Sequence, residues 1–306
     1  MIDKERVNEK IGAFAKNAEK IATNVVDKTK ETVSKSKDTV VGVMDVNGDG
    51  KVNIEDVIVL GLKTPGVRVN REEFLLKEFE KNYSYATVKK AIMSTPASAG
   101  ISNDDINRIA DDVIKFEQKC TTGMAVGLGI PGGAAMAAAI PADIIQYYGY
   151  LLRASQKLMY LYGFPQIDVK EEGQNFDSET LNILIVCFGV MYGVAGANQA
   201  IKAMAKALAN GVEKKLLRAA LMKGTIYPIV KNVSKWFGVR MTKEVFAGFF
   251  KKAIPIVGGA INGGIAYLSF KPCCDRLKES LLDTYLSNPQ HRETENEDMI
   301  IIESDE

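Results

Sequence analysis

Apolar residues recur every three or four positions along most of this chain, the spacing of one face of an α-helix. The first such stripe is narrow and predicts one amphipathic helix over residues 3–40. Its apolar positions are Val7, Ile11, Phe14, Ala18, Ile21 and Val25. Residues 1–40 hold nine Lys/Arg and seven Asp/Glu, so the polar face is close to neutral. A helix lying on the domain, a short coiled coil and a membrane-surface helix all fit this pattern.

Shorter amphipathic helices follow. The spacing predicts helices over residues 54–63, 71–83 and 85–94, and then a loop over 96–100 that contains Pro and Gly. Ser102 is placed to cap a further helix, whose first turn carries two acids.

The stretch Gly123–Gly163 has two contrasting halves. The first is almost wholly small and apolar, and the sequence Pro131-Gly132-Gly133 interrupts it. Pro141 predicts the start of a strong helix, where Asp143 would favour the positive end of the helix dipole. Small residues let helix backbones approach closely. The stretch therefore predicts a Gly-rich helical hairpin, as does a second one at 254–264. The glycines that would permit close contact are Gly132, Gly133, Gly258 and Gly259.

Three segments carry no charge: 120–142, 180–201 and 253–270. The second is long enough to cross a bilayer, which needs about 20 apolar residues. The first and third are interrupted by Pro and Gly, so each could instead be a hairpin. Membrane spans and a buried core both remain open at this point.

Charge is nearly balanced over the 306 residues, with a net value of +1, but it is unevenly distributed. Residues 202–252 hold twelve Lys/Arg against two acids, Glu213 and Glu244, a local balance of +10. Solvated helix faces and attraction to anionic lipid both explain this segment. Few aromatic residues and no recognition fold accompany it, which disfavours nucleic acid. The acidic tail from Glu293 is expected to be disordered.

The clearest motif runs from Asp45 to Asp56 and has the spacing of an EF-hand calcium loop, with Gly50 at the sharp turn. Calcium takes six to eight oxygen ligands, and alternate positions of this loop supply them. The candidate ligands are Asp45, Asn47, Asp49, the carbonyl of Lys51, Asn53 and Asp56. The motif is most similar to dockerin repeats, although it occurs once and Asp replaces the commoner Glu at its last position. The alternative is a simple Asn-Gly and Asp-Gly turn before a helix.

Several enzyme classes are disfavoured by what the sequence lacks. The one histidine, His291, lies in the tail, which leaves no core histidine for a Ser-His-Asp or Cys-His site. Four cysteines without a C-x-x-C pair predict buried free thiols in a reducing compartment. The glycines at 127, 129 and 132 spell a dinucleotide fingerprint, but they follow a helix rather than a strand. Asp143 could act as a catalytic acid, although a role at a helix start is the simpler interpretation.

Two sequence motifs resemble motifs of the bacterial EcsC family. The first is Ile140-Pro-Ala-Asp143 followed by Tyr160-Leu-Tyr-Gly163, and the second is Ile254-Pro-Ile-Val-Gly-Gly259 followed by Asn262-Gly-Gly264. Both also resemble an uncharacterised membrane-associated domain found with some bacterial GTPases. The similarity covers roughly residues 100–285. It implies an all-helical protein connected with a transporter or other membrane protein, and it implies no particular reaction.

Together these observations predict an all-α multi-helix bundle with Gly-rich helical hairpins, preceded by a long amphipathic helix and one EF-hand-like loop. The predicted boundaries are 1–44, 45–63, 64–100, 101–287 and 288–306. The expected function is a non-enzymatic, calcium-binding protein at an anionic membrane surface. The charged N-terminus predicts no secretory signal, which places the protein in the cytoplasm, peripheral or integral to the inner membrane. A soluble hydrolase using a carboxylate such as Asp143 is the alternative.

Overall fold

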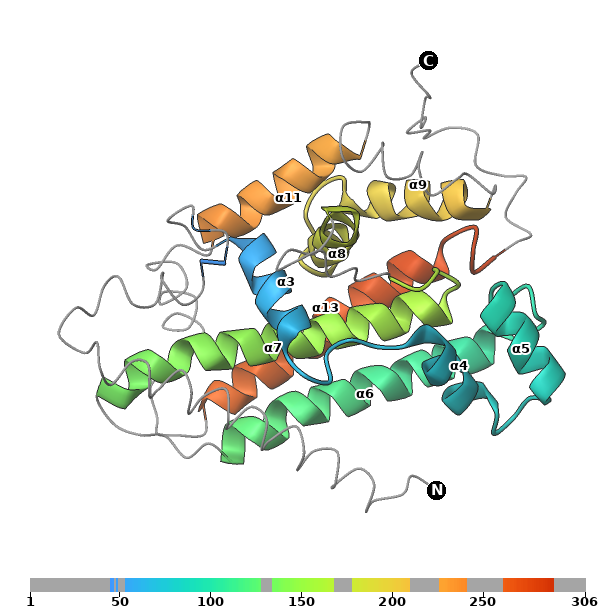
Figure 1. Cartoon of the computed structure of the whole chain (residues 1–306), viewed down its shortest axis with the longest axis horizontal. Coiled ribbons are helices and arrows are strands. Elements are labelled where there is room, and N and C mark those ends of the chain that lie inside the picture. Colours follow the sequence, from blue (N-terminus) through green and yellow to red (C-terminus); the bar gives the residue numbers. More distant parts are fainter. Residues whose placement is uncertain are drawn as a thin grey trace. The chain divides into compact units, whose positions relative to one another are not determined.

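The computed structural model describes residues 45, 46, 48, 53–127, 134–167, 178–209, 226–240 and 261–288. These residues form nine α-helices and no strand (Figure 1), which confirms the predicted all-α fold class. The predicted helix over 3–40, the Gly-rich turns at 131–133 and 254–259, and the acidic tail lie outside the described residues.

The helix bounds agree with the amphipathic pattern in the first part of the chain. The predicted helix at 54–63 is α3, and Ser102 caps α6 by accepting a hydrogen bond from Asp105 N–H at 3.2 Å. The predicted helix at 71–83 ends earlier, at Phe79. The helices are α3 Ile54–Lys63, α4 Arg71–Phe79, α5 Tyr85–Met93, α6 Asn103–Gly127, α7 Ala134–Leu161, α8 Ser178–Met191, α9 Ala197–Ala209, α11 Tyr227–Arg240 and α13 Ile261–Leu282.

Pro141 does not start a helix. Helix α7 begins at Ala134, so the predicted start at Pro141 and the predicted helix-start role of Asp143 are both wrong. The physical reason is the alanine-rich run from Ala134 to Ala139, because alanine has the highest helix propensity and the run extends the helix ahead of the proline. Helix α7 ends at Leu161, and Gly163 after it has φ +93°, while Phe164 N–H donates to the Met159 carbonyl at 2.9 Å.

The uncharged segment 180–201 is not one long helix. Helix α8 ends at Met191, and Gly193 follows it with φ +69°. Val194 N–H donates to the Gly189 carbonyl at 2.8 Å, which is the hydrogen bond of a Schellman motif. Helix α9 then begins at Ala197. At 1.5 Å per residue α8 is about 21 Å long, shorter than the hydrocarbon core of a bilayer.

The chain divides into two compact units, and the first comprises residues 1–68, 116–152 and 237–270. In this unit α3 buries Ile54, Ile58 and Leu62 completely or nearly so. A Cβ built on Gly61 would lie 2.5 Å from Leu152 Cδ1 and 3.7 Å from Gly149 Cα, so α3 approaches α7 closely at a pair of glycines. The domain boundaries expected from the sequence stay a prediction.

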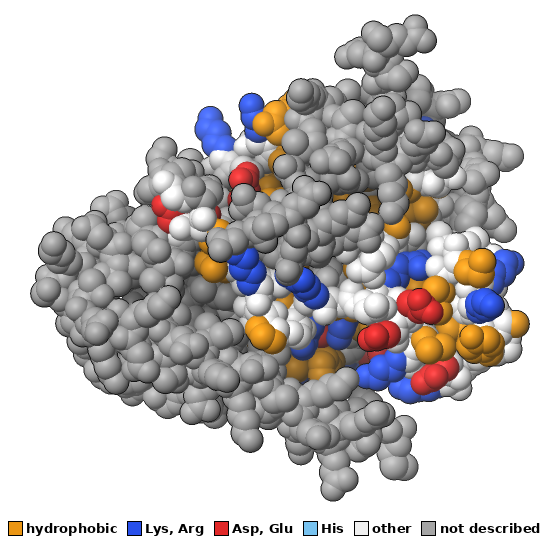
Figure 2. Space-filling view, viewed as in Figure 1, with side chains coloured by type: hydrophobic (Ala, Val, Ile, Leu, Met, Phe, Trp, Pro, Cys, Tyr) orange, Lys and Arg blue, Asp and Glu red, His pale blue; other side chains and the backbone are white. Residues whose placement is uncertain are grey.

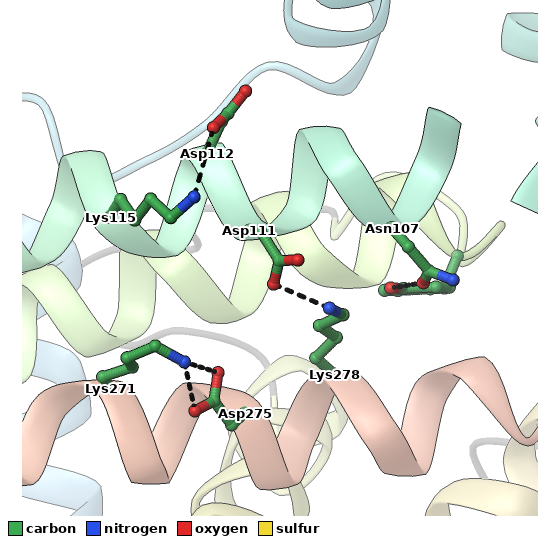
Figure 3. Close-up of polar contacts among 8 residues, drawn as sticks. Asn107, Asp111, Asp112, Lys115, Lys271, Asp275 and Lys278 are labelled. Atoms are coloured by element: carbon green, nitrogen blue, oxygen red, sulfur yellow. Dashed lines mark hydrogen bonds and ion pairs between the residues drawn. The ribbon is translucent and has the colours of Figure 1, made fainter. Parts of the chain in front are cut away.

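The second unit comprises residues 69–115, 153–236 and 271–306. Here α6 and α13 are joined by an ion pair between Asp111 and Lys278, 2.7 Å long, whose side chains point toward one another in Figure 3. Tyr162, just after α7, donates to Asn107 Oδ1 of α6 at 2.7 Å. Within α13, Lys271 and Asp275 pair one turn apart at 2.6 Å.

Close packing at a glycine also occurs in the second unit. A Cβ built on Gly189 of α8 would lie 2.6 Å from Val233 Cγ2 of α11 and 2.9 Å from Ala197 Cβ. Neither neighbour can easily retreat, because valine has a stiff χ1 in a helix and the alanine Cβ is attached directly to the backbone. The close contact between α8 and α11 therefore requires a residue without a side chain at position 189.

The most unusual group of the second unit is the buried guanidinium of Arg71, whose side chain is 7% exposed. It donates to the carbonyls of Ile92 at 2.6 Å, Ala91 at 3.3 Å and Ser94 at 3.0 Å, all at the end of α5. Its Nε donates to the Phe164 carbonyl at 3.0 Å. Burial lowers the pKa of Arg71 from its ordinary value. Among the described residues no carboxylate pairs with it, so backbone carbonyls compensate this charge.

Substituting Gly189 should destabilise the protein more than substituting Gly61. For Gly189→Ala we predict a loss of about 1–3 kcal/mol from overpacking, which exceeds the roughly 1 kcal/mol that alanine gains in a helix. For Gly61→Ala the nearest atom is the flexible end of Leu152, so we expect unfolding free energy within about 1 kcal/mol of wild type. Guanidinium unfolding of both variants measures this difference. Equal midpoints would show that α8 and α11 can separate without cost.

Removing the Arg71 guanidinium should strongly destabilise the protein. Arg71→Met leaves four carbonyls without their donor, and we predict a loss of about 3 kcal/mol or more. Arg71→Lys should recover only part of this, because a compact ammonium cannot reproduce the planar fork. Arg108→Lys is the control, since Arg108 forms an exposed ion pair with Asp105, a kind worth up to about 1 kcal/mol. Thermal unfolding in which Arg71→Met matches Arg108→Lys would contradict the prediction.

Candidate calcium loop

The structure describes three of the six predicted calcium ligands: Asp45, Asn53 and Asp56. The other three, Asn47, Asp49 and Lys51, lie outside the described residues. The geometry of the loop is therefore known at its first, second and fourth positions and at its last four.

Asp56 closes the loop. Its side chain is 1% exposed, and both of its carboxylate oxygens accept backbone hydrogen bonds. Asp56 Oδ1 accepts from Val46 N–H at 3.1 Å, and Oδ2 accepts from Asn53 N–H at 2.8 Å. One carboxylate thus joins the second position of the loop to the ninth. This closure brings the last predicted ligand next to the backbone that immediately follows Asp45.

Asn53 makes the reciprocal contacts that start helix α3. Its Oδ1 accepts from Glu55 N–H at 2.8 Å and from Asp56 N–H at 3.2 Å. Together with the Asp56–Asn53 bond this is a capping box. Because the cap fixes both side chains, the end of the loop is held by the first turn of α3.

The side chain of Asp45 stabilises a turn at the start of the loop. Its Oδ1 accepts from Gly48 N–H at 2.8 Å, and Gly48 has φ +73°, a conformation that glycine adopts without strain. Asp45 and Gly48 therefore take part in a turn at the start of the loop. A turn and a cap account for each of these hydrogen bonds without a metal ion.

The residues present nevertheless fit calcium. The donors are carboxylate and amide oxygens, the type that calcium prefers. Within the described part of the chain no group of three or more Asp, Glu, His or Cys side chains is assembled. Asp49, a further predicted ligand of the loop, lies outside the described residues.

The lysines of the basic segment 202–252 divide into two groups where they are described. Lys202 pairs with Asp283 at 2.6 Å, and Lys206 lies over the ring of Tyr285 at 5.4 Å. These two stabilise the second unit. On α11, Lys231 lies over the ring of Tyr227 of the same helix at 4.8 Å. Lys231 and Lys235 are exposed, and that helix carries no acid. Among the described helices, none is both long and apolar enough to cross a membrane.

Groups that could serve in catalysis are poorly placed where the structure describes them. All four cysteines are unpaired thiols and buried, as predicted. Burial raises the pKa of Cys187 to about 12 and that of Cys273 to about 11, which keeps both thiols protonated and unreactive at neutral pH. Asp143 lies within α7, and its side chain is outside the description, as is His291. No described contact favours the hydrolase alternative.

Asp105 has a strongly perturbed pKa with a structural cause. The hydrogen bond from Arg108, then those from Tyr83 and Ser102, lower its pKa to about 2. Such a carboxyl is ionised at neutral pH and cannot act as a general acid there. Its role is to fix the start of α6, since Asp105 and Ser102 bond to each other as well as to the helix backbone.

Two buried charges escaped the sequence analysis. Arg71 and Glu117 are 7% and 0% exposed, and neither lies in a motif. A helical pattern assigns Arg and Glu to the solvated face by default. Only contacts between distant parts of the chain, such as Arg71 with Phe164, distinguish them.

No protein-family model matches the chain, and comparisons with curated proteins and with solved structures return no match.

Proposed function

We propose that this chain is a non-enzymatic helical protein that binds calcium through the loop 45–56 and associates with an anionic membrane surface. The observation that carries the proposal is the closure of the loop by the buried carboxylate of Asp56, which accepts from Val46 and Asn53 N–H groups. A transporter or other membrane protein as partner, and a location at the cytoplasmic side of the inner membrane, follow from the EcsC resemblance.

The calcium part of the proposal follows from what the loop must achieve. Calcium ligands spread over twelve residues have to converge, and convergence needs the two ends of the loop to be held together. The cap on α3 and the Asp56–Val46 bond provide this restraint before any ion binds. Asp45, Asn47, Asp49, the Lys51 carbonyl, Asn53 and Asp56 would then supply the oxygens. A simple turn would not require three acids and two asparagines at these positions.

The membrane part is supported by charge. The segment 202–252 carries +10, and the described lysines of α11 are exposed on a helix without acids. Each basic residue near an anionic surface contributes about 1 kcal/mol, falling off within a Debye length. These charges support peripheral association with the membrane surface.

Calorimetric titration tests the calcium site. We expect wild type to release or absorb heat on binding calcium, and Asp45→Ala and Asp49→Ala to lose it. Bound calcium should also raise the unfolding free energy by about 2.7 kcal/mol at a hundredfold excess over Kd. Asp112→Ala is the control, because Asp112 is an exposed acid of α6 outside the loop. No heat from wild type at about millimolar calcium, or loop variants that titrate like the control, would reduce the loop to a turn.

Vesicle flotation tests the membrane association. We expect the protein to float with anionic vesicles at low ionic strength and to be released by salt, because screening shortens the reach of its lysines. Retention after both salt and carbonate washes would mean insertion rather than peripheral binding. A protein that stays with neither anionic nor neutral vesicles at low salt would refute this part of the proposal.

A further inference from the structure

Helix α5 presents a surface that differs from the rest of the described molecule. Tyr85 is 73% exposed and Met93 is 78% exposed, and these are the large apolar side chains that lie exposed among the described residues. Both belong to one helix of nine residues. Exposed aromatic and aliphatic side chains that gather on one element mark a contact surface more often than scattered ones do.

The exposed positions of α5 form one continuous face. At about 100° per residue, five exposed side chains occupy an arc of about 140°. In order around the helix they are Tyr85, Lys89, Met93, Ala86 and Lys90. The buried residues of the helix, Val88 and Ala91, lie on the opposite side. Figure 2 shows hydrophobic and basic side chains together over α5, at the right of the view.

This face is basic as well as apolar. Lys89 and Lys90 lie between the two apolar ends, and α5 contains no acidic residue. Within the described residues neither lysine forms an ion pair, and the exposed acids nearest in the sequence belong to α4 and the turn after it. The acids beside this face belong to α4, which packs against α5 and exposes Glu72 and Glu73, and to Glu80 after it. The positive charge on the face itself comes from Lys89 and Lys90.

The face is also held rigidly. Ser84 caps the helix by accepting from Thr87 N–H at 3.2 Å, and Arg71 binds the carbonyls of Ala91, Ile92 and Ser94 at the other end. A nine-residue helix is marginal by itself in water, so these contacts are what keep the exposed side chains in one arrangement.

We propose that the α5 face, defined as Tyr85, Ala86, Lys89, Lys90 and Met93, docks onto an anionic lipid surface. Tyr85 and Met93 enter the boundary between headgroups and acyl chains, and Lys89 and Lys90 bind lipid phosphates and carboxylates. An aromatic ring with a polar tip, an aliphatic side chain and flanking lysines are the composition of interfacial helices. The inference rests on the proposed membrane association and gives it a specific contact surface.

Lipid suits this face better than a protein partner does. A stable protein–protein interface buries about 800 Å² on each side, from roughly 20–30 residues. Five side chains of a short helix fall well below this. A membrane imposes no such minimum on one element, because other basic residues of the chain can bind the same surface independently.

Vesicle sedimentation with wild type and paired variants tests the inference. The vesicles contain equal parts of phosphatidylcholine and phosphatidylserine, and pure phosphatidylcholine serves as the neutral comparison. The charge variant is Lys89→Glu with Lys90→Glu, and the apolar variant is Tyr85→Ser with Met93→Ser. The matched control is Lys115→Glu with Lys119→Glu, because both lysines are exposed on α6. Circular dichroism checks that each exposed substitution leaves the fold unchanged.

We expect the charge variant to bind about tenfold or more weakly at low salt, since two basic residues near the surface are lost and two acids are added. The apolar variant should also bind about threefold or more weakly at low salt, because its contacts with the boundary between headgroups and acyl chains are lost. The control should stay within about twofold of wild type, because its lysines lie outside the docking face.

Two results would overturn the inference in distinguishable ways. If wild type binds and both α5 variants bind like the control, the membrane association stands but its contact surface lies elsewhere, for example in 202–252. If wild type itself does not bind at low salt, the proposed membrane association fails and the docking face fails with it.

Discussion

The second unit depends on a charge that cannot reach water. The guanidinium of Arg71 is compensated by four backbone carbonyls, three at the end of α5 and one from Phe164 after α7. Carbonyls at a helix C-terminus have no partner within the helix and carry the negative end of its dipole, so a buried cation suits them. Burying the cation without a partner and burying the carbonyls without a donor would each be unfavourable. The hydrogen bonds between them offset both costs. Segments about 20 and 93 residues away from Arg71 are thereby held at one point.

Neighbouring polar groups extend this junction. Arg71 N–H donates to Gln166 Oε1 at 2.6 Å, and Val69 N–H donates to Gln156 Oε1 at 3.1 Å. The chain between α3 and α4 is thus bound along its backbone by side chains from α7 and the residues after it. Loops with satisfied backbone groups can be buried without penalty. The short helices α4 and α5 are placed by these long-range contacts more than by their own propensity.

Helix starts could be predicted from residues close together in the sequence, whereas contacts between distant parts of the chain could not. Ser102 indicated the start of α6, because a cap involves residues three apart, whereas the cap that Asn53 and Asp56 form on α3 was interpreted only as calcium ligands. Gly193 follows the end of α8 within segment 180–201, just as Gly163 follows the end of α7. The absence of charged residues over this segment had instead suggested one helix long enough to cross a bilayer. The structure describes three of the six candidate calcium ligands, namely Asp45, Asn53 and Asp56. The burial of Asp56 could not be foreseen, since an aspartate near a helix start is ordinarily solvated.

The shared role of Asp56 has a consequence for any cation in the loop. The same carboxylate belongs to the first turn of α3, whose Ile54, Val57 and Ile58 are fully buried. Asp56, the last predicted ligand, therefore cannot shift toward or away from an ion without moving a helix that the core holds in place. Selectivity between Ca²⁺ and the smaller Mg²⁺ depends on the size and flexibility of the ligand cage. A loop closed in this way would discriminate by ionic radius, and the packing beneath α3 would set the radius it accepts.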